Sequence, residues 1–348
     1  MGMIGLSIEI LSRIIIVNLL ILMCLAIYVI ILHKRKNIQI RRDEKYLKEI
    51  QHGWYHYLIN KGERADKRLV PENEDEIRVI EKILSSYLAN ISNPDIHKKI
   101  RSFSNQYLSH YYGDQLKRRK WSARMNALYR ISDFQIDILL DDCKKQELKK
   151  CSKEEWLQLL KIYSKFDINS CIEKIIIEPV LFSEHEYRKL VLNFEQDHLE
   201  RLLQVFDEVP RPCQFSIIDT LGLKRETDYV PFLEGLLHHE EAEIRIRLLK
   251  AIYESGWIIN PETYLHFVHS SLWEERLMVT KLLGRLPLDE TFSCFKILLE
   301  DESWWVRNQA AKTVGSIKNG KEKLQAFIQT SRDKFAIEMV NEILKKGS

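Results

Sequence analysis

Histidines and paired carboxylates are the residues of this chain whose spacing comes closest to that of a reactive site. The histidine sets are His52 and His56, His238 and His239, and His266 and His269. None has a cysteine or carboxylate beside it at a spacing typical of zinc ligands, so we expect no metal. The acidic pairs Asp141-Asp142 and Glu240-Glu241 are more typical of helix ends or turns than of an acid–base pair. No phosphate-binding glycine loop and no Gly-x-Ser-x-Gly motif occurs, so we predict no catalytic residue, no cofactor and no enzyme activity.

Arginines recur at a regular spacing in the C-terminal part of the chain. Arg245, Arg276 and Arg307 fall 31 residues apart, and Gln214 stands one period earlier. Guanidinium groups bind phosphates and carboxylates through paired hydrogen bonds, so one interpretation of the series is a track for an anionic partner. A second interpretation, that the arginines stabilise the fold, depends on the elements that carry them.

Apolar residues keep the same period, which identifies those elements. The matching positions are Ile217, Leu248, Val279 and Ala310, then Leu221, Ile252, Leu283 and Val314, then Gly222, Tyr253, Gly284 and Gly315. A period in this range is typical of a stacked solenoid, because a single unit cannot bury its apolar face alone. Solenoids present long surfaces rather than reaction centres, so the pattern favours a binding function.

The pattern predicts two antiparallel helices in each unit. In the last unit, residues 306–317 should form the first helix, with apolar side chains at helical spacing. Gly284 and Gly315 lie near the ends of such helices, where a left-handed residue stops a helix. Asn260 and Asp289 are suited to cap the second helices, because their side chains accept from free main-chain donors.

The last unit also carries a signature, Asp-x-x-x-x-Val-Arg-x-x-Ala-x-x-x-Leu-Gly. It is matched by Asp301, Val306, Arg307, Ala310, Val314 and Gly315. This pattern resembles the HEAT-like repeats in their short bacterial form. The resemblance is strong over residues 214–317, although Glu275 departs from it at the Val position. It is faint over residues 121–209, where residues 121–131 with Arg124 already look like a repeat.

The resemblance implies an array that curves so that the second helices line its concave face. It also implies that each arginine bridges neighbouring units by pairing with an acidic or main-chain acceptor, and Asp301 near Arg307 fits that role. Trp273 and Trp304 share a phase, so we expect them to pack between units. Trp305 falls outside the buried stripe, and exposed tryptophan is enriched at interfaces. The candidate partner-binding residues are therefore Trp305, Arg245, Arg276 and Arg307.

A hydrophobic run near the N-terminus predicts a membrane anchor. Residues 14–32 are apolar apart from Asn18, and these 19 residues at ~1.5 Å each reach about 28 Å, close to the hydrocarbon thickness of a bilayer. Residues 33–36 (His-Lys-Arg-Lys) follow in place of a small-residue cleavage site. We therefore predict a transmembrane helix rather than a removed signal.

Basic residues are far denser after this run than before it. Only Arg13 precedes it, and the basic residues that follow include Lys34, Arg35, Lys36, Arg41 and Arg42. The distribution predicts a single-pass protein of the inner (cytoplasmic) membrane, with its N-terminus outside and its C-terminal solenoid in the cytoplasm. These five residues are also the candidates for contact with the membrane surface, where anionic lipid headgroups are possible partners.

Composition supports an all-α fold. The chain has 348 residues, of which 45% are hydrophobic and only 12 are Gly and 8 Pro. The net charge of +3 is too small to suggest a general nucleic-acid binder, and six scattered cysteines without a CxxC pair suggest reduced thiols. The expected segments are an N-terminal stretch 1–13, a transmembrane helix 14–32, a basic juxtamembrane helix and linker 33–75, irregular helical repeats 76–212, and regular HEAT-like repeats 213–348 ending in a capping helix.

These features predict a membrane-anchored cytoplasmic scaffold or accessory subunit that binds a protein partner at the inner membrane face. A membrane enzyme complex, such as a polysaccharide-synthesising glycosyltransferase, is one natural partner. The alternative is a solenoid that binds anionic lipid or nucleic acid through the basic residues 117–120 and the juxtamembrane charges. An enzyme resembling bilin lyases or DNA glycosylases is a further hypothesis, for which the sequence carries no motif.

Overall fold

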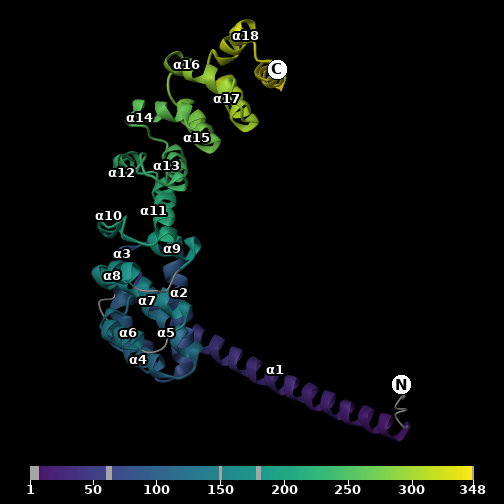
Figure 1. Ribbon diagram of the computed structural model, residues 1–348. Helices are drawn as coiled ribbons and strands as arrows, with labels where there is room; N and C mark the ends of the chain where they lie inside the picture. Colours follow the sequence, from purple (N-terminus) through teal and green to yellow (C-terminus); the bar gives the residue numbers. More distant parts are fainter. Residues whose placement is uncertain (1–7, 60–64, 149–150, 178–181, 347–348) are drawn as a thin grey trace. The chain divides into compact units, whose positions relative to one another are not determined.

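The computed structural model describes residues 8–59, 65–148, 151–177 and 182–346. In these ranges every regular element is helical, and the chain forms two compact units, Met1–Phe166 and Asp167–Ser348. The prediction of an all-α fold with a long apolar N-terminal helix followed by a packed helical array is therefore confirmed. Figure 1 shows the helices of both units.

The first unit consists of one very long helix and shorter helices that pack on its C-terminal part. The long helix is α1 (Ile8–Leu58). The others are η1 (Lys67–Leu69), α2 (Glu74–Asn90), α3 (Pro94–Phe103), the π-helical turn η2 (Ser104–Leu108), α4 (Ser109–Lys117), α5 (Trp121–Phe134), η3 (Asp137–Leu139), α6 (Leu140–Glu147) and α7 (Lys153–Phe166).

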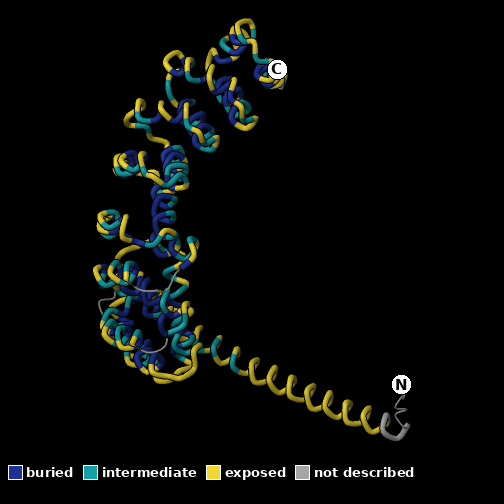
Figure 2. Tube along the Cα trace, in the orientation of Figure 1, coloured by how far each residue is buried: buried dark blue, intermediate teal, exposed yellow. Residues whose placement is uncertain are grey.

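Helix α1 joins the residues expected as a transmembrane helix and those expected as a juxtamembrane helix into one element. No Pro or Gly interrupts it before Gly53, so nothing in the sequence breaks the main-chain hydrogen bonds. Every residue from Ser12 to Ile38 is exposed, and Gln39 is the first that other helices partly cover (Figure 2). The helix therefore projects from the unit over its whole apolar part.

The C-terminal part of α1 belongs to the core of the first unit. Trp54 and Leu58 are 0% and 2% exposed, and Leu69 of η1 packs on the same helix at 2% exposure. A Cβ at Gly53 would lie 3.0 Å from Leu69 Cδ2. The described part of the expected linker, from residue 65 onward, thus packs on α1, whereas residues 60–64 lie outside the described residues.

The second unit alternates two layers of helices. One layer contains α9 (Glu184–Val191), α11 (Arg211–Lys224), α13 (Ala242–Ser255), α15 (Trp273–Leu283), α17 (Trp304–Ser316) and α19 (Lys334–Lys346). The other contains α10 (Gln196–Gln204), α12 (Val230–Gly235), α14 (Glu262–Leu265), α16 (Leu288–Leu299) and α18 (Gly320–Thr330), with η4 (Thr227–Tyr229) before α12 and η5 (His266–His269) after α14. Helix α8 (Ile168–Ile177) precedes both layers. We call the first layer the arginine layer, because it carries Arg245, Arg276 and Arg307.

The residues that recur every 31 positions line the core between these layers. Ile217, Leu248, Val279 and Ala310 are each 0% exposed. They meet apolar residues of the other layer, among them Leu233, Tyr264 and Phe295, which are at most 1% exposed. Because each pair of helices buries its apolar side against its neighbours, the core runs continuously along the unit.

The role predicted for Gly284 and Gly315 is wrong. Gly284 follows α15 in a right-handed conformation (φ −66°), and Gly315 lies within α17. Among the glycines that the structure describes, Gly256 is the one in a left-handed conformation, and it follows α13 with φ 89°. Gly284 instead permits a close contact, because a Cβ there would lie 2.3 Å from Thr313 Cγ2 on the next helix of the layer.

The predicted caps of the second helices are also wrong. Helix α14 begins at Glu262 after Pro261, and α16 begins at Leu288 after Pro287, with no side-chain cap at either. The Asn260 Nδ2 instead donates to the buried Glu234 carboxylate (2.8 Å), whereas Asp289 accepts from Lys323 Nζ (2.6 Å). Proline fixes the entry into both helices, which leaves the neighbouring polar side chains free for tertiary contacts.

The arginine layer lies on the inner side of the bend of this unit, as Figure 1 shows for α11, α13, α15 and α17. The resemblance to HEAT-like repeats implied that the other layer, which contains the second helices, would lie on this inner side. Small residues explain the difference, because they let successive helices of the arginine layer approach closely. A Cβ at Gly222 of α11, for example, would lie 2.8 Å from the Ala251 Cα of α13.

Replacing Gly222 with alanine should destabilise the second unit. The added Cβ has no room against the main chain of Ala251, and overpacking of this kind costs roughly 1–3 kcal/mol. Thermal unfolding of the full chain should therefore show a melting temperature lower by several degrees. Gly235→Ala is the matched control, because no atom lies within 4 Å of a Cβ at Gly235. Equal melting temperatures for the two variants would contradict the close approach.

Candidate functional site

The arginines predicted to bind a partner form a repeated arrangement, which we call the arginine ladder. Arg245 of α13 donates from Nε to Glu275 Oε1 (2.7 Å) on α15, the next helix of the layer. Arg276 of α15 donates from Nε to Asp301 Oδ2 (2.5 Å), which lies in the turn before α17. Arg124 in the first unit does the same with Glu155 Oε1 (2.6 Å) on α7. Each guanidinium thus links one helix pair to the following pair.

The four arginines also share a second contact, in which the guanidinium binds the main chain shortly before its own helix. In each case Nη1 donates to the main-chain oxygen six residues earlier. The acceptors are Arg118 for Arg124 (3.3 Å), His239 for Arg245 (2.7 Å), Ser270 for Arg276 (2.8 Å) and Asp301 for Arg307 (2.6 Å). These carbonyls belong to the turn before the helix, so the arginine also holds that turn in place.

The bridge between Arg276 and Asp301 contains the most buried arginine of the three bridges. The side chains of Arg276 and Asp301 are only 8% and 5% exposed. The hydrogen bond to Asp301 raises the pKa of Arg276 above its ordinary value, so the guanidinium stays charged. Arg276 Nη2 donates to Asp301 Oδ1 as well (2.9 Å). Since these donors are already engaged, the geometry favours the bridging interpretation over a track for an external anion.

Gln214 occupies the position that an arginine holds in the later repeats, and Arg211 forms the ion pair to the next helix in its place. Gln214 Nε2 donates to the main-chain oxygen of Phe206 (2.8 Å), which keeps the local contact. Arg211, one turn earlier, forms the ion pair with Glu241 at the start of the next helix of the layer. The link between α11 and α13 therefore persists although its residues differ.

The ladder is incomplete at Arg307. Its Nε is buried and has no hydrogen-bond partner among the described residues, although Nη1 keeps both local acceptors. The third residue of α15 is Glu275, but the third residue of α19 is Ala336. The guanidinium carbon lies instead 5.8 Å from the centre of the Phe335 ring. Sequence reasoning missed this difference, which the comparison of α19 with α15 would have revealed.

Exposed aromatic residues stand at the start of three successive helices of the arginine layer. Trp273 begins α15, Trp304 and Trp305 begin α17, and Phe335 is the second residue of α19. Their exposures are 38%, 48%, 58% and 68% in that order. The predicted packing of Trp273 and Trp304 between units is therefore at most partial, whereas Trp305 is on the surface. We call these four residues the aromatic row.

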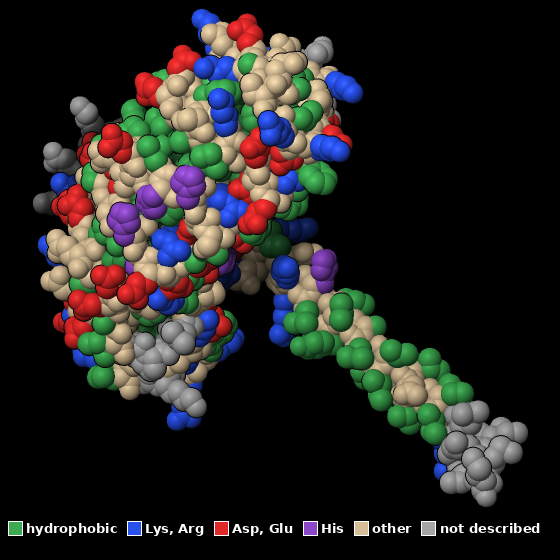
Figure 3. Space-filling model, turned by 45° about the horizontal axis from the view of Figure 1, so that its top comes forward, with side chains coloured by type: hydrophobic (Ala, Val, Ile, Leu, Met, Phe, Trp, Pro, Cys, Tyr) green, Lys and Arg blue, Asp and Glu red, His purple; other side chains and the backbone are tan. Residues whose placement is uncertain are grey.

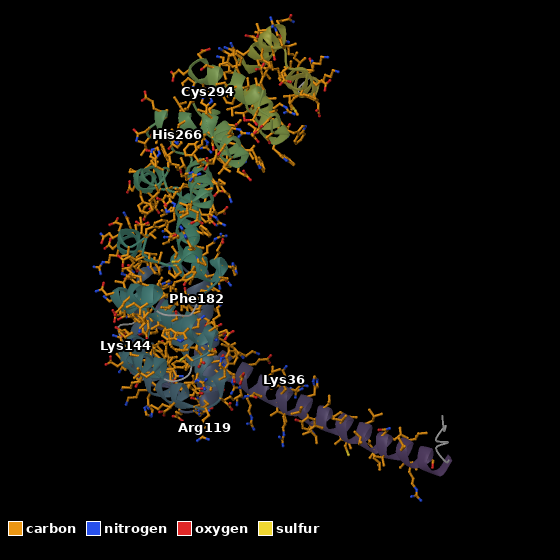
Figure 4. The ribbon with its side chains drawn as sticks, in the orientation of Figure 1. Lys36, Arg119, Lys144, Phe182, His266 and Cys294 are labelled. Atoms are coloured by element: carbon orange, nitrogen blue, oxygen red, sulfur yellow. The ribbon has the colours of Figure 1, made fainter. Side chains whose placement is uncertain are left out.

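Of the basic residues expected at the membrane surface, three lie on the projecting part of α1, and Arg41 and Arg42 follow just beyond Gln39, where α2 begins to pack on the helix. The five residues are Lys34, Arg35, Lys36, Arg41 and Arg42, and each is exposed. In Figure 3 the apolar side chains cover the projecting helix, and Figure 4 labels Lys36 among the basic side chains that follow them. A surface that is apolar apart from Asn18 thus changes to a basic one along a single helix.

Within the described residues, no group of three or more His, Cys, Asp or Glu side chains is placed to hold a metal ion. His238 and His266 stack with ring centres 5.2 Å apart, and burial lowers the pKa of His266. Stacked rings do not direct their nitrogens at a common ion, so this contact is one of packing.

Comparison with known proteins identifies no family for this chain. No protein-family model matches the chain, and no curated protein matches it. Among solved structures, an engineered protein is similar with 12% sequence identity and a TM-score of 0.25, over 80% of this chain and 82% of that one.

Replacing Arg276 with alanine should strongly destabilise the second unit, because the buried Asp301 carboxylate loses its charged partner. Removing one member of a buried ion pair costs about 3–5 kcal/mol. Denaturant unfolding of the full chain measures the loss. Arg118→Ala is the comparison, since Arg118 and Glu74 are 52% and 59% exposed and such pairs contribute about 0–1 kcal/mol.

A double variant separates the ion pair from other effects of the substitution. Asp301 Oδ1 also accepts from Ser303 N (2.7 Å), so Asp301→Asn keeps that contact while removing the charge. Arg276→Ala with Asp301→Asn should recover part of the stability lost in Arg276→Ala alone, because the asparagine leaves no buried charge unpaired. Unchanged stability of Arg276→Ala together with lost partner binding would instead support the anion track.

Proposed function

We propose that this chain is a single-pass membrane protein whose helical array binds a protein partner at the inner face of the membrane. Helix α1 is long and apolar enough to span a bilayer. Its large apolar side chains between Ile14 and Leu32 are 45–65% exposed. Soluble monomers rarely expose apolar patches beyond a few hundred Å², so a lipid environment accounts for this surface.

The charge distribution along α1 supports the orientation of the proposed anchor. Arg13 is the only basic residue from position 8 to the end of the apolar run, and the five membrane-surface residues follow it. Since cytoplasmic flanks carry the excess of Lys and Arg, both compact units belong in the cytoplasm. The unbroken helix then connects the bilayer directly to the core of the first unit.

The aromatic row is the observation that carries the proposed binding function. Trp and Tyr with Arg dominate the binding energy of protein interfaces, and they act from the centre of a surface that excludes water. The row combines three tryptophans and a phenylalanine, each at least 38% exposed. A partner segment with apolar side chains matches this surface.

The sequence resemblance to HEAT-like repeats is part of the proposal. Such arrays bind partners over long surfaces, and an anchor confines this one to the plane of the membrane. Confinement raises the effective concentration toward other membrane proteins. A scaffold or accessory subunit of a membrane enzyme complex, for example one that makes a polysaccharide, is therefore the role we propose, with binding rather than catalysis as its activity.

Trp305→Ala should weaken binding of the partner without unfolding the array. A photo-crosslinker placed at position 305 of the full chain in native membranes captures the partner, which is then purified for titration. Loss of an interface tryptophan costs about 2 kcal/mol or more, so Kd should rise at least tenfold. Helicity by circular dichroism should stay unchanged.

Trp257→Ala provides the control, because Trp257 is similarly exposed (52%) but does not belong to the aromatic row. Its Kd should equal that of the unmodified chain. If Trp305→Ala binds as tightly as Trp257→Ala, the aromatic row is not the binding surface.

A further inference from the structure

The first unit is held close to the bilayer surface if α1 spans the membrane, so this inference rests on the proposed function. Gln39 lies seven residues beyond Leu32, which is about 10 Å along the helix axis. The headgroup region of each leaflet is about 5–8 Å thick, and the Debye length at physiological salt is about 8 Å. The edge of the unit that contacts Gln39 therefore lies within electrostatic range of the lipid headgroups.

The N-terminus of α2 forms this edge of the unit. Gln39 Nε2 donates to Asp75 Oδ1 (3.3 Å), in the first turn of α2. Glu74, the neighbour of Asp75, accepts from Arg118 Nη2 (2.8 Å). This exposed contact places residues 117–120, with the sequence Lys-Arg-Arg-Lys, beside the same edge. We call these residues the basic loop, and Figure 4 labels its Arg119.

The main chain of the basic loop is held by hydrogen bonds, and two of its four side chains carry charges that are not paired with described residues of the unit. Arg124 Nη1 donates to the main-chain oxygens of Arg118 (3.3 Å) and Arg119 (2.7 Å), and the buried Glu155 holds Arg124 in place. The carbonyls therefore point toward Arg124. All four side chains of the loop are exposed. Lys117 pairs with Asp114 and Arg118 with Glu74, which leaves Arg119 and Lys120 as the outward charges.

We propose that the basic loop is a second membrane contact, which binds the phosphate and carboxylate groups of anionic phospholipid headgroups beside the anchor. It extends the positive surface of Lys34, Arg35, Lys36, Arg41 and Arg42 laterally, away from the axis of α1. One spanning helix leaves the tilt and rotation of the attached unit free. A second contact to the side restricts both the tilt and the rotation of the first unit.

Fluorescence quenching in nanodiscs tests the contact with the full chain. Cys24, Cys151 and Cys294, the thiols that are not buried, are replaced by serine, and Ser122→Cys beside the loop carries a fluorophore. Discs contain a trace of lipid with a nitroxide headgroup as quencher, in phosphatidylcholine alone or mixed with phosphatidylserine. Quenching should be stronger in the anionic discs, and added salt should reverse the difference.

Charge reversal identifies the residues responsible. Arg119→Glu with Lys120→Glu should lower the equilibrium constant for headgroup contact about fivefold for each positive charge removed. Lys312→Glu with Lys318→Glu makes the same charge change at exposed positions of the second unit and should have no effect. An equal effect of both variants would show a response to net charge alone and would overturn the proposal.

The remaining outcomes are also decisive. Equal quenching in neutral and anionic discs overturns the lipid contact while leaving the anchor intact. A chain that fails to co-purify with the discs refutes the spanning helix itself, which is a separate result. If labelled RNA binds the chain in neutral discs through Arg119 and Lys120, the basic loop is a nucleic-acid site and the lipid assignment is wrong.

Discussion

The bridge from a guanidinium to a carboxylate on a following turn or helix is the interaction on which the array depends. The bridge between Arg276 and Asp301 is the most buried example, since both side chains are almost fully buried. Two buried charges are tolerated only when each satisfies the other, so the bridge fixes the register between α15 and α17. The same arginine holds the turn before its own helix. One residue thus sets both the local geometry of a repeat and its stacking on the next.

The second constraint is the continuity of α1. Residues that face lipid in the proposed arrangement and residues of a protein core, such as Trp54, belong to one helix that contains no Pro, and no Gly before Gly53. The orientation of the first unit is therefore tied to that of the anchor. Contacts of Asp43 with Lys82 (3.3 Å) and of Gln39 with Asp75 extend the packed surface toward the bilayer side of the unit. A domain on a flexible tether would have no such coupling.

The sequence was sufficient for the periodic part of the fold, because buried positions such as Ile217 and Val279 repeat at one spacing and are fully buried. It was insufficient where the same residue type can either end or cap a helix or make a tertiary contact. Gly284 was expected to end a helix, yet its lack of a Cβ serves the contact with Thr313 of the next helix. Asn260 was expected to cap, yet it donates to the buried Glu234. Both contacts depend on neighbours distant in sequence. The exposure of Trp305 followed from its phase. The missing carboxylate at Arg307 was also present in the sequence, as Ala336 in place of Glu275, although its consequence for the buried Nε appears in the structure.

Cysteine labelling of intact cells tests the central claim, which is that one helix crosses the bilayer and carries both units on its cytoplasmic side. Single cysteines at positions 10, 36 and 309 are introduced after replacement of Cys24, Cys151 and Cys294, since the other native thiols are buried. The account predicts that a membrane-impermeant maleimide labels position 10 in intact cells, and positions 36 and 309 only after lysis. Labelling of all three positions from the same side would contradict it.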